Sequence, residues 1–495
     1  MAVVNKIGKV LKRNHALVSF DQERIIRAIR RAADSIGGFE QDYLEGINDR
    51  IFAAGKTTEG IAEFLSDLVV VCLNAKPEHL VANFPPTVEE IQDVVLHVLQ
   101  STGFTVTADA YTCYRWGRHW VREEAITEEQ FVGSGYPKEY MERLLAWNRT
   151  HGCDTVEGLN ELVRAGRLKP LIEAAIAEYE RSLDEAAEKV IERLDAGDEL
   201  KMIWISGPSS SGKTTSTVKL AKRLERWGLR FLMLNLDDYF WPLIEHPTDW
   251  INDRNYETPE AMDIQLLNAH LKQLLEGKTV EKPVYSFKEG RRIGMKLIKR
   301  QPDQIMVLDC LHGFYPPLTE GIERSAMFRL YIEAMNPLYE REFMLPLLEG
   351  DRTGRRLTRF ADVRLLRRML RDARHRNHTP LATLLHWHYV RAGELFSIIP
   401  LKGLADHVLN GGMPFDLPVL KPFFSGERSL WPRREELDQY TSLLDARIRY
   451  QRIQRLLDSV EGLTLDQVED PELIPTDAVV REFIGGSTIE IPHNE

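Results

Sequence analysis

The chain has 495 residues, of which 43% are hydrophobic and 28% charged, and its formal net charge is -11 at pH 7. Such a length predicts about two to four domains with buried cores, and the composition excludes a wholly disordered chain or a membrane protein. The acidic balance argues against broad binding to nucleic-acid phosphates. The four cysteines lack C-x-x-C spacing and support neither a disulfide framework nor a zinc ribbon, so we expect a cytoplasmic protein without a targeting or transmembrane segment.

The first 123 residues predict a small, mainly helical domain. Apolar residues recur at helical spacing over Asp21 to Ser35. A second helix is expected after Pro85-Pro86, where Thr87 and Glu90 have the spacing of a capping box. A third is expected over Ala108 to Arg122.

This region resembles the ATP-cone, a nucleotide-sensing module known from the N-terminus of ribonucleotide reductases. The resemblance rests on Val10-Leu11-Lys12-Arg13, Phe20-Asp21 with Arg24-Ile25, Glu90-Ile91-Gln92-Asp93, and Ala110-Tyr111 with Tyr114-Arg115 and Arg118. It implies a site for a regulatory ATP or dATP. The candidate phosphate ligands there are Lys12, Arg13, Arg24, Arg115 and Arg118. The alternative is that these are solvated surface charges on a helical docking domain.

Residues 124–200 are polar and helical in pattern and form a predicted connector, with a long charged helix from about Pro170 to Leu194. From 201 to about 425, apolar runs alternate with amphipathic helices, which is typical of a doubly wound α/β domain with a mainly parallel sheet. The predicted buried strands are Met202 to Ile205, Arg230 to Leu234, Gln304 to Leu308 and Met327 to Ile332. Residues 426–495 are expected to form an extension that packs on this domain, with a helix from Arg434 to about Ser459.

A phosphate-binding loop follows the first of these strands. Residues 207–214 read Gly-Pro-Ser-Ser-Ser-Gly-Lys-Thr, a complete G-x-x-x-x-G-K-[ST] motif between a strand and a helix. Backbone N–H groups of such a loop point at phosphate oxygens, while Lys213 reaches the β- and γ-phosphates and Thr214 offers its hydroxyl to Mg²⁺. The predicted ATP-binding residues in the loop are Gly207, Ser209, Ser210, Ser211, Gly212, Lys213, Thr214 and Thr215.

A carboxylate stands at the end of the next predicted strand, in Leu236-Asp237-Asp238-Tyr239-Phe240. Asp237 is the candidate general base, because a carboxylate beside the phosphate loop can accept the proton of an attacking hydroxyl. Two other roles remain open for Asp237, a ligand of metal-bound water or a helix N-cap, and Asp238 can exchange roles with it.

This domain resembles the uridine kinase and phosphoribulokinase family of P-loop kinases, and more closely a bacterial uridine-kinase-like branch of it. Beyond the loop and the strand end, the resemblance rests on Asn255-Tyr256-Glu257, Pro283-Val284-Tyr285-Ser286-Phe287, Arg367-Arg368 with Arg371-Asp372 and Arg376, Phe415 to Pro422, and Arg481 to Gly486. It covers about 220 residues in the right order.

The resemblance implies roles for individual residues. Lys213 and Asp237 would be catalytic, together with Arg368 and Arg371 of an arginine lid. Arg376 would join them in binding ATP. Thr214 and Asp309 would hold Mg²⁺, Asp309 standing where the family usually has Glu. The candidate acceptor-binding residues are Asp238, Tyr239, Glu257, Tyr285 and Arg291.

The expected activity is therefore transfer of the γ-phosphate of ATP to a hydroxyl of a small molecule, most simply a nucleoside such as uridine or cytidine. A sugar phosphate, a polyol or a glycerate-like acid is the alternative acceptor. The positive charge of Arg291-Arg292 would suit an anionic acceptor. A non-catalytic nucleotide-sensing regulator is the alternative from another class. We expect a homo-oligomer regulated by nucleotide at the N-terminal domain, with neither nucleic acid nor membrane as a partner.

Overall fold

The computed structural model describes residues 3–36, 38–39, 58–80, 84–122, 127, 138–246, 248, 252–339, 358–376, 378–427, 429–440 and 443–490. The chain forms two compact units, one within Met1–Glu142 and the other within Arg143–Arg341 and Leu357–Glu495. Within the described residues, no helix is long and apolar enough to cross a membrane.

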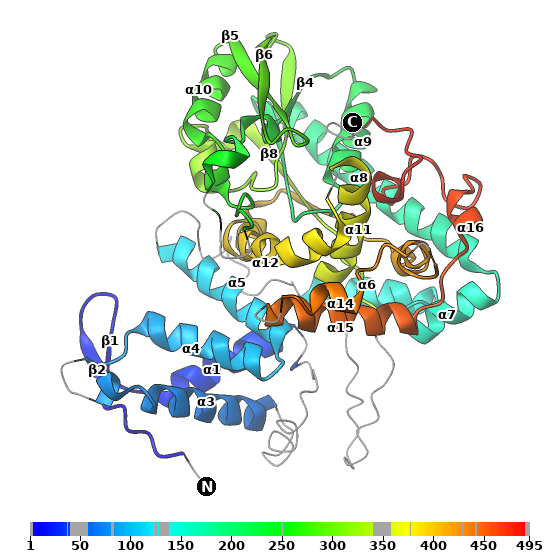
Figure 1. The fold of residues 1–495 in the computed structure, drawn as a ribbon. Helices are drawn as coiled ribbons and strands as arrows, with labels where there is room; N and C mark the ends of the chain where they lie inside the picture. The colour runs from blue at the N-terminus through cyan, green and yellow to red at the C-terminus, as the bar shows by residue number, and fades with distance from the viewer. Residues whose placement is uncertain are drawn as a thin grey trace. The chain divides into compact units, whose positions relative to one another are not determined.

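Unit 1 is a helical layer with a small hairpin (Figure 1). Its core contains Ile29, Leu65, Val69 and Val98, all at most 2% exposed. The expected capping box is confirmed, because Thr87 accepts from the Glu90 backbone and the Glu90 carboxylate accepts from the Thr87 backbone. The elements are β1 (Lys9–Leu11), β2 (Leu17–Ser19), α1 (Gln22–Ser35), α3 (Thr58–Asn74), α4 (Val88–Ser101) and α5 (Thr105–Arg122).

Unit 2 contains a five-stranded parallel sheet in the order β4-β7-β3-β8-β9. The strands are β3 (Met202–Ser206), β4 (Arg230–Asn235), β7 (Gln304–Asp309), β8 (Met327–Glu333) and β9 (His407–Asn410). A separate antiparallel hairpin, β5 (Thr279–Ser286) with β6 (Arg291–Lys299), lies between β4 and β7 in the sequence. The doubly wound α/β fold is confirmed, with β3 in the centre of the sheet.

Helices pack against this sheet in one continuous core, which includes residues of α8, α9, α11, α12 and the C-terminal helices. The α-helices from α6 onward are α6 (Lys138–Thr150), α7 (Val156–Arg164), α8 (Leu168–Asp195), α9 (Lys213–Glu225), α10 (Ile264–Leu275), α11 (Phe360–His375), α12 (Pro380–Ser397), α13 (Asp416–Leu420), α14 (Arg434–Leu437), α15 (Leu444–Ser459), α16 (Leu465–Glu469) and α17 (Arg481–Ile484). The end of the described chain runs beside α9 (Figure 1).

Two expectations about single elements were wrong. The helix expected from Arg434 to Ser459 is two helices, because α14 ends at Leu437, whose carbonyl accepts from Tyr440 N at 2.9 Å in a turn. The strand at Arg230 is not fully buried, since β4 is an edge strand and the side chain of Met233 is 46% exposed.

Candidate active site

The phosphate loop joins β3 to α9. Position 207 requires glycine, because the backbone of β8 passes so close that a Cβ there would collide with the carbonyl oxygen of Ile332. Gly212 has a left-handed φ of 90° at the N-cap of α9, a conformation that favours glycine. The hydroxyls of Ser210 and Ser211 are buried and have no hydrogen-bond partner in the described part of the chain. Such donors suit the oxygens of a phosphate.

Lys213 folds back onto this loop. Its Nζ donates to the carbonyl oxygens of Gly207 and Pro208, both at 3.0 Å. Burial lowers the pKa of Lys213, while the nearby charge of Asp309 acts in the opposite direction. A half-buried ammonium group whose hydrogen bonds among the described residues go to carbonyl oxygens gains from an anion, so the geometry suits a phosphate ligand.

Two carboxylates follow neighbouring strands at the same edge of the sheet. Asn235 of β4 lies opposite Asp309 of β7 in the parallel register, and Asp237 follows in the short 3-10 helix η2 (Leu236–Tyr239). The Asp237 N–H donates to the Asn235 side chain at 2.9 Å, which fixes the turn. No hydrogen bond to the Asp237 carboxylate is found among the described residues, so this carboxylate is available as a proton acceptor.

Asp309 lies beside Thr214, whose hydroxyl donates to Asp309 Oδ2 at 3.2 Å. Burial raises the pKa of Asp309 to about 6, although the charge of Lys213 opposes the shift. Over the described residues there is no cluster of three His, Cys, Asp or Glu side chains that could enclose a metal ion. A hydroxyl and one carboxylate fit Mg²⁺, which usually keeps several waters and takes further oxygens from substrate phosphates.

Three arginines of α11 donate hydrogen bonds to the phosphate loop, and each also forms an ion pair with a carboxylate of the protein. Arg364 pairs with Glu394, Arg367 with Asp416 at 2.7 Å, and Arg368 with Asp372 at 2.6 Å. All three also reach the loop, because they donate to Ser209 O at 2.9 Å, to Ser210 O at 3.4 Å and to Ser209 Oγ at 2.7 Å, respectively. Arg368, predicted as a lid residue, thus holds the loop in place in this structure.

Arg371 and Arg376 are less fully compensated. The carboxylate of Glu482 lies 3.9 Å from Arg371, and that of Asp372 lies 3.7 Å from Arg376. Burial lowers the pKa of Arg371 to about 9, and the like charges of Arg376 and Arg368 add to this effect. A nearby anion would offset the burial cost of Arg371, whose charge acts on Lys213 of the loop.

Asp238 and Tyr239, predicted to contact the acceptor, are engaged within the protein. The buried Asp238 carboxylate pairs with Lys282 and accepts from Tyr285 N at 3.0 Å. The Tyr239 hydroxyl lies 3.0 Å from His270 Nδ1. These contacts attach the β5–β6 hairpin and α10 to η2, which positions neighbouring Asp237.

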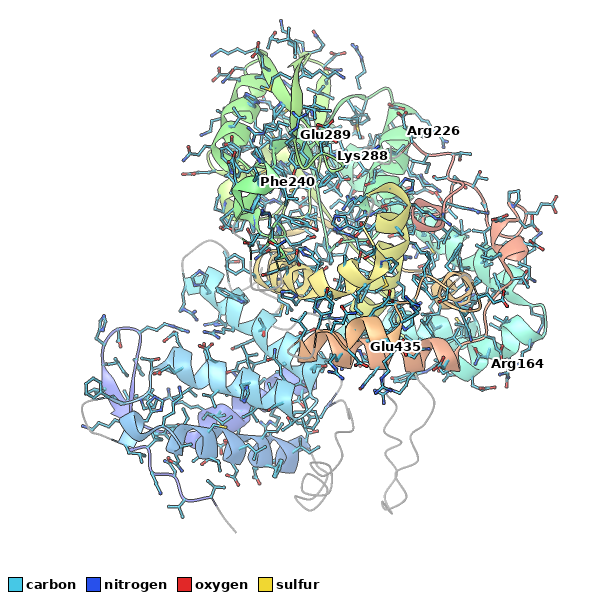
Figure 2. The ribbon with its side chains drawn as sticks, viewed as in Figure 1. Arg164, Arg226, Phe240, Lys288, Glu289 and Glu435 are labelled. Carbon is cyan, nitrogen blue, oxygen red and sulfur yellow. The ribbon has the colours of Figure 1, made fainter. Side chains whose placement is uncertain are left out.

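An aromatic cluster lies beside the candidate base. The rings of Phe240, Tyr285 and Phe287 have centroids 5.2 to 6.0 Å apart. Burial raises the pKa of Tyr285 to about 12, and the charge of Asp237 contributes, which places the two groups near each other. The hairpin turn, where Figure 2 labels Lys288 and Glu289, is joined to the segment after Phe240 by the hydrogen bond from Leu243 N to Gly290 O at 2.7 Å.

Glu257 is buried between two cations. Its carboxylate lies 3.2 Å from Arg368 and 3.7 Å from His386 Nε2. Burial alone would raise the pKa of Glu257, but Arg368 and His386 hold it well below its usual range. His386 also stacks on Tyr256, with ring centroids 4.4 Å apart. Glu257 therefore stays ionised at neutral pH.

The two arginines after the hairpin turn differ in environment. Arg291 is 60% exposed in its side chain and pairs with Glu289. Arg292, which sequence reasoning weighed only for its charge, donates to the carbonyl oxygens of Tyr239 and Phe240 at 3.0 and 3.1 Å. Both arginines already have protein partners.

In unit 1, two predicted nucleotide ligands converge on α4. Arg13, after β1, pairs with Glu89, and Arg115 of α5 donates to Asp93 at 2.6 Å. Lys12 lies in the same turn as Arg13, where its N–H donates to Ala16 O, and Arg118 follows Arg115 by one helical turn. Arg24 on α1 pairs locally with the N-cap residue Asp21 at 3.1 Å.

Sequence reasoning missed Glu482, which contacts both Thr215 and Arg371. It also missed Glu394, which accepts from Ser209 N at 3.2 Å while pairing with Arg364. The contact of Glu482 with Thr215 joins residues 267 positions apart, and that of Glu394 with Ser209 joins residues 185 positions apart. The signal for Glu482 was its place in the Arg481 to Gly486 run, which gave no direction for its side chain.

Comparisons with known proteins match two separate regions of the chain, one in each unit. Residues 202–338 match the model of the phosphoribulokinase/uridine kinase family, and residues 8–119 match that of the ATP cone domain. The uridine kinase of Deinococcus deserti is 31% identical over 214 residues, which are 43% of this chain and 88% of that protein. The uridine kinase of Borrelia duttonii is 26% identical over 43% of this chain and 87% of its own length. A solved structure described as a candidate fructose transport system kinase from Silicibacter sp. TM1040 is 16% identical, with a TM-score of 0.28 over 46% of this chain and 98% of that one.

Proposed function

Since the chain belongs to the phosphoribulokinase/uridine kinase family, we propose that it transfers the γ-phosphate of ATP to a hydroxyl of a pyrimidine nucleoside such as uridine or cytidine. Family membership supports ATP-dependent phosphate transfer to a hydroxyl. The nucleoside acceptor and the roles of single residues are the proposal. The observation that carries it is the juxtaposition of Asp237, Lys213 and the Thr214–Asp309 pair at one edge of the sheet.

The residues divide the work of an in-line transfer. Asp237 accepts the proton of the attacking hydroxyl and orients its oxygen toward phosphorus. Lys213 and Arg371 stabilise the charge that develops on the transferring group. Thr214 and Asp309 would hold Mg²⁺, which would supply positive charge to neutralise the phosphates. Each step is a matter of position and electrostatics and needs no covalent enzyme intermediate.

The surroundings of Asp237 favour a neutral acceptor with a flat ring. The aromatic cluster of Phe240, Tyr285 and Phe287 gives the neighbourhood of Asp237 an apolar, aromatic character that suits a nucleobase. The arginines that would attract an anionic acceptor, Arg291 and Arg292, are engaged by Glu289, Asp263 and two backbone carbonyls. This arrangement supports a nucleoside over a sugar phosphate or a glycerate-like acid.

A panel of acceptors tests the proposal. Purified full-length protein with ATP and Mg²⁺ is incubated with uridine, cytidine, ribulose 5-phosphate, glycerate and a polyol, and ADP release is compared with formation of a phosphorylated product. Uridine or cytidine should give the highest kcat/KM. Preference for an anionic acceptor would contradict the nucleoside assignment, and ATP binding without transfer to any of them would favour a nucleotide-sensing regulator.

The match to the ATP cone domain supports a second part of the proposal, regulation by ATP or dATP bound to unit 1. A nucleotide site there is redundant for catalysis but useful for sensing the nucleotide pool. Coupling of this kind is typically about 1–3 kcal/mol and requires two states that the effector binds unequally. We propose that a change of subunit packing in a homo-oligomer provides these states.

A further inference from the structure

The C-terminal helix places a carboxylate on the phosphate-loop helix. Oε2 of Glu482 accepts from the Thr215 hydroxyl at 2.8 Å and from the Thr215 N–H at 3.2 Å. Glu482 is 3% exposed and Thr215 is fully buried. The contact is therefore an interior one, shielded from water.

These two donors are of the kind that a phosphate uses. Thr215 is the third residue of α9, and its N–H precedes the first intrahelical bond, which runs from Ser216 N to Gly212 O at 3.1 Å. In a phosphate loop, N–H groups that have no partner within the helix, and the neighbouring hydroxyls, point at phosphate oxygens. A carboxylate bound there presents the same negative oxygens to the same donors.

Other contacts place the same segment over the loop. A methyl group of Val479 lies 2.5 Å from the position that a Cβ on Gly212 would take. Oε1 of Glu482 lies 3.9 Å from Arg371, a proposed phosphate ligand. Burial raises the pKa of Asp309 and the charge of Glu482 adds to the shift, so Glu482 is within electrostatic reach of the metal-site carboxylate.

The C-terminal segment that contains Glu482 is packed into the core of unit 2. Val480 and Phe483 are fully buried in the common core, and the Arg367 guanidinium lies 4.9 Å from the Phe483 ring centroid. The guanidinium of Arg481 donates to Ile474 O at 2.6 Å. Because the backbone is anchored in this way, release of Thr215 requires only the Glu482 side chain to move.

We propose that Glu482 is an internal competitor for nucleotide, whose carboxylate occupies the Thr215 donors until a nucleotide phosphate displaces it. The inference rests on the proposed function, because it takes Gly207 to Thr215 as the nucleotide site. Apparent affinity then equals intrinsic affinity reduced by the fraction of molecules in which Thr215 is free. The C-terminal helix thus sets the ATP concentration at which the site fills.

Glu482→Gln tests this in the full chain, because the amide keeps the shape of the side chain and removes its charge. Calorimetric titration with Mg·ATP is compared for wild type, E482Q and the control Glu472→Gln, an exposed residue of the same extension. E482Q should bind Mg·ATP about tenfold more tightly, and E472Q should match wild type. Inorganic triphosphate should show the same gain, since the competition is for phosphate donors.

Unchanged or weaker binding by folded E482Q overturns the inference, as does a gain with Mg·ATP that inorganic triphosphate lacks. Should E482Q fail to fold, Glu482→Asp serves instead, because its shorter side chain withdraws the carboxylate from Thr215, and it should also tighten binding. If wild type and variant bind Mg·ATP equally and transfer phosphate, only this inference fails. If neither binds Mg·ATP, the proposed kinase function fails with it.

Discussion

The hydroxyl of Thr214 donates a hydrogen bond to the carboxylate of Asp309 over 3.2 Å, and this bond joins the first turn of α9 to the end of β7. Since β7 pairs directly with β3, the sheet itself holds together two oxygens of the kind that Mg²⁺ prefers. Burial also raises the pKa of this carboxylate, so metal binding there depends on pH.

Mg²⁺ binding should weaken as the pH falls through about 6. Burial raises the pKa of Asp309 to about 6, so the carboxyl group is neutral below that pH and cannot hold the metal. The apparent Mg²⁺ dissociation constant, measured between about pH 5 and about pH 8, should rise on the acid side of this midpoint. Asp309→Asn should bind Mg²⁺ weakly without this midpoint, and an unchanged midpoint in that variant would assign the titration to another group.

The same shift has the opposite sign for stability. The folded state binds the Asp309 proton more tightly than the unfolded state, so the contribution of this group to the free energy of unfolding is largest below the ordinary pKa of 3.8 and is lost as the pH rises through about 6. Asp309→Asn should therefore melt at a higher temperature than wild type above pH 6. A lower melting temperature would show that the charge is stabilising in place.

Asp237→Asn should lower kcat by about 10²–10⁴-fold, because an amide cannot take the proton of the attacking hydroxyl. Affinity for Mg·ATP should change little, since no hydrogen bond links this carboxylate to the phosphate loop in the described residues. Steady-state kinetics and calorimetry together separate the two effects. Asp303→Asn, at an exposed ion pair with Arg230, is the matched control and should leave both values unchanged.

Lys282→Met should destabilise unit 2 by about 3–5 kcal/mol, because it leaves the Asp238 carboxylate buried without its counter-charge. Arg230→Met breaks the exposed pair with Asp303 and should cost under about 1 kcal/mol. Denaturant unfolding followed by tryptophan fluorescence gives both values. Similar costs for the two variants would mean that Asp238 finds another partner or takes up a proton.

Lys213→Ala should abolish nucleotide binding at the phosphate loop while unit 1 keeps about one site for ATP or dATP. Adding Lys12→Ala or Arg115→Ala to that variant should remove the residual binding, whereas the exposed Lys6→Ala should not. Equilibrium dialysis gives the stoichiometry, and light scattering reports any change of assembly. Absence of residual binding in Lys213→Ala would leave unit 1 with a docking role.

Local patterns predicted the elements that carry the chemistry. The apolar runs at Met202, Gln304 and Met327 were correctly assigned to strands. The strand-end position predicted that Asp237 lies beside the loop, whereas Asp309 followed from the family resemblance. The strand β9 was missed, because its four residues, His407 to Asn410, are too few for a periodic signal.

The charge network could not be predicted in the same way. The partners of Arg364 and Arg368 lie on α12, on the turn that holds Glu257, and on α11 itself, and sequence spacing does not report which carboxylate a buried arginine selects. The roles of Asp238 and Arg292 were likewise set by tertiary contacts. Ion pairing between residues far apart in the sequence depends on packing and desolvation in the folded chain. A local sequence pattern carries no information on either.

Strands β4 and β7 are neighbours in the sheet, yet the chain leaves β4 at Asn235 and does not enter β7 until Gln304. That excursion begins with η2, which holds Asp237, and then carries α10 and the β5–β6 hairpin with Tyr285, whereas Lys213 and Asp309 belong to the sheet and its loop. Segments that return to adjacent strands can lengthen, shorten or be exchanged without changing the strand register. Descendants of such a chain can therefore acquire new acceptors by altering the part of the excursion that follows η2, while Asp237, Lys213 and Asp309 keep their places.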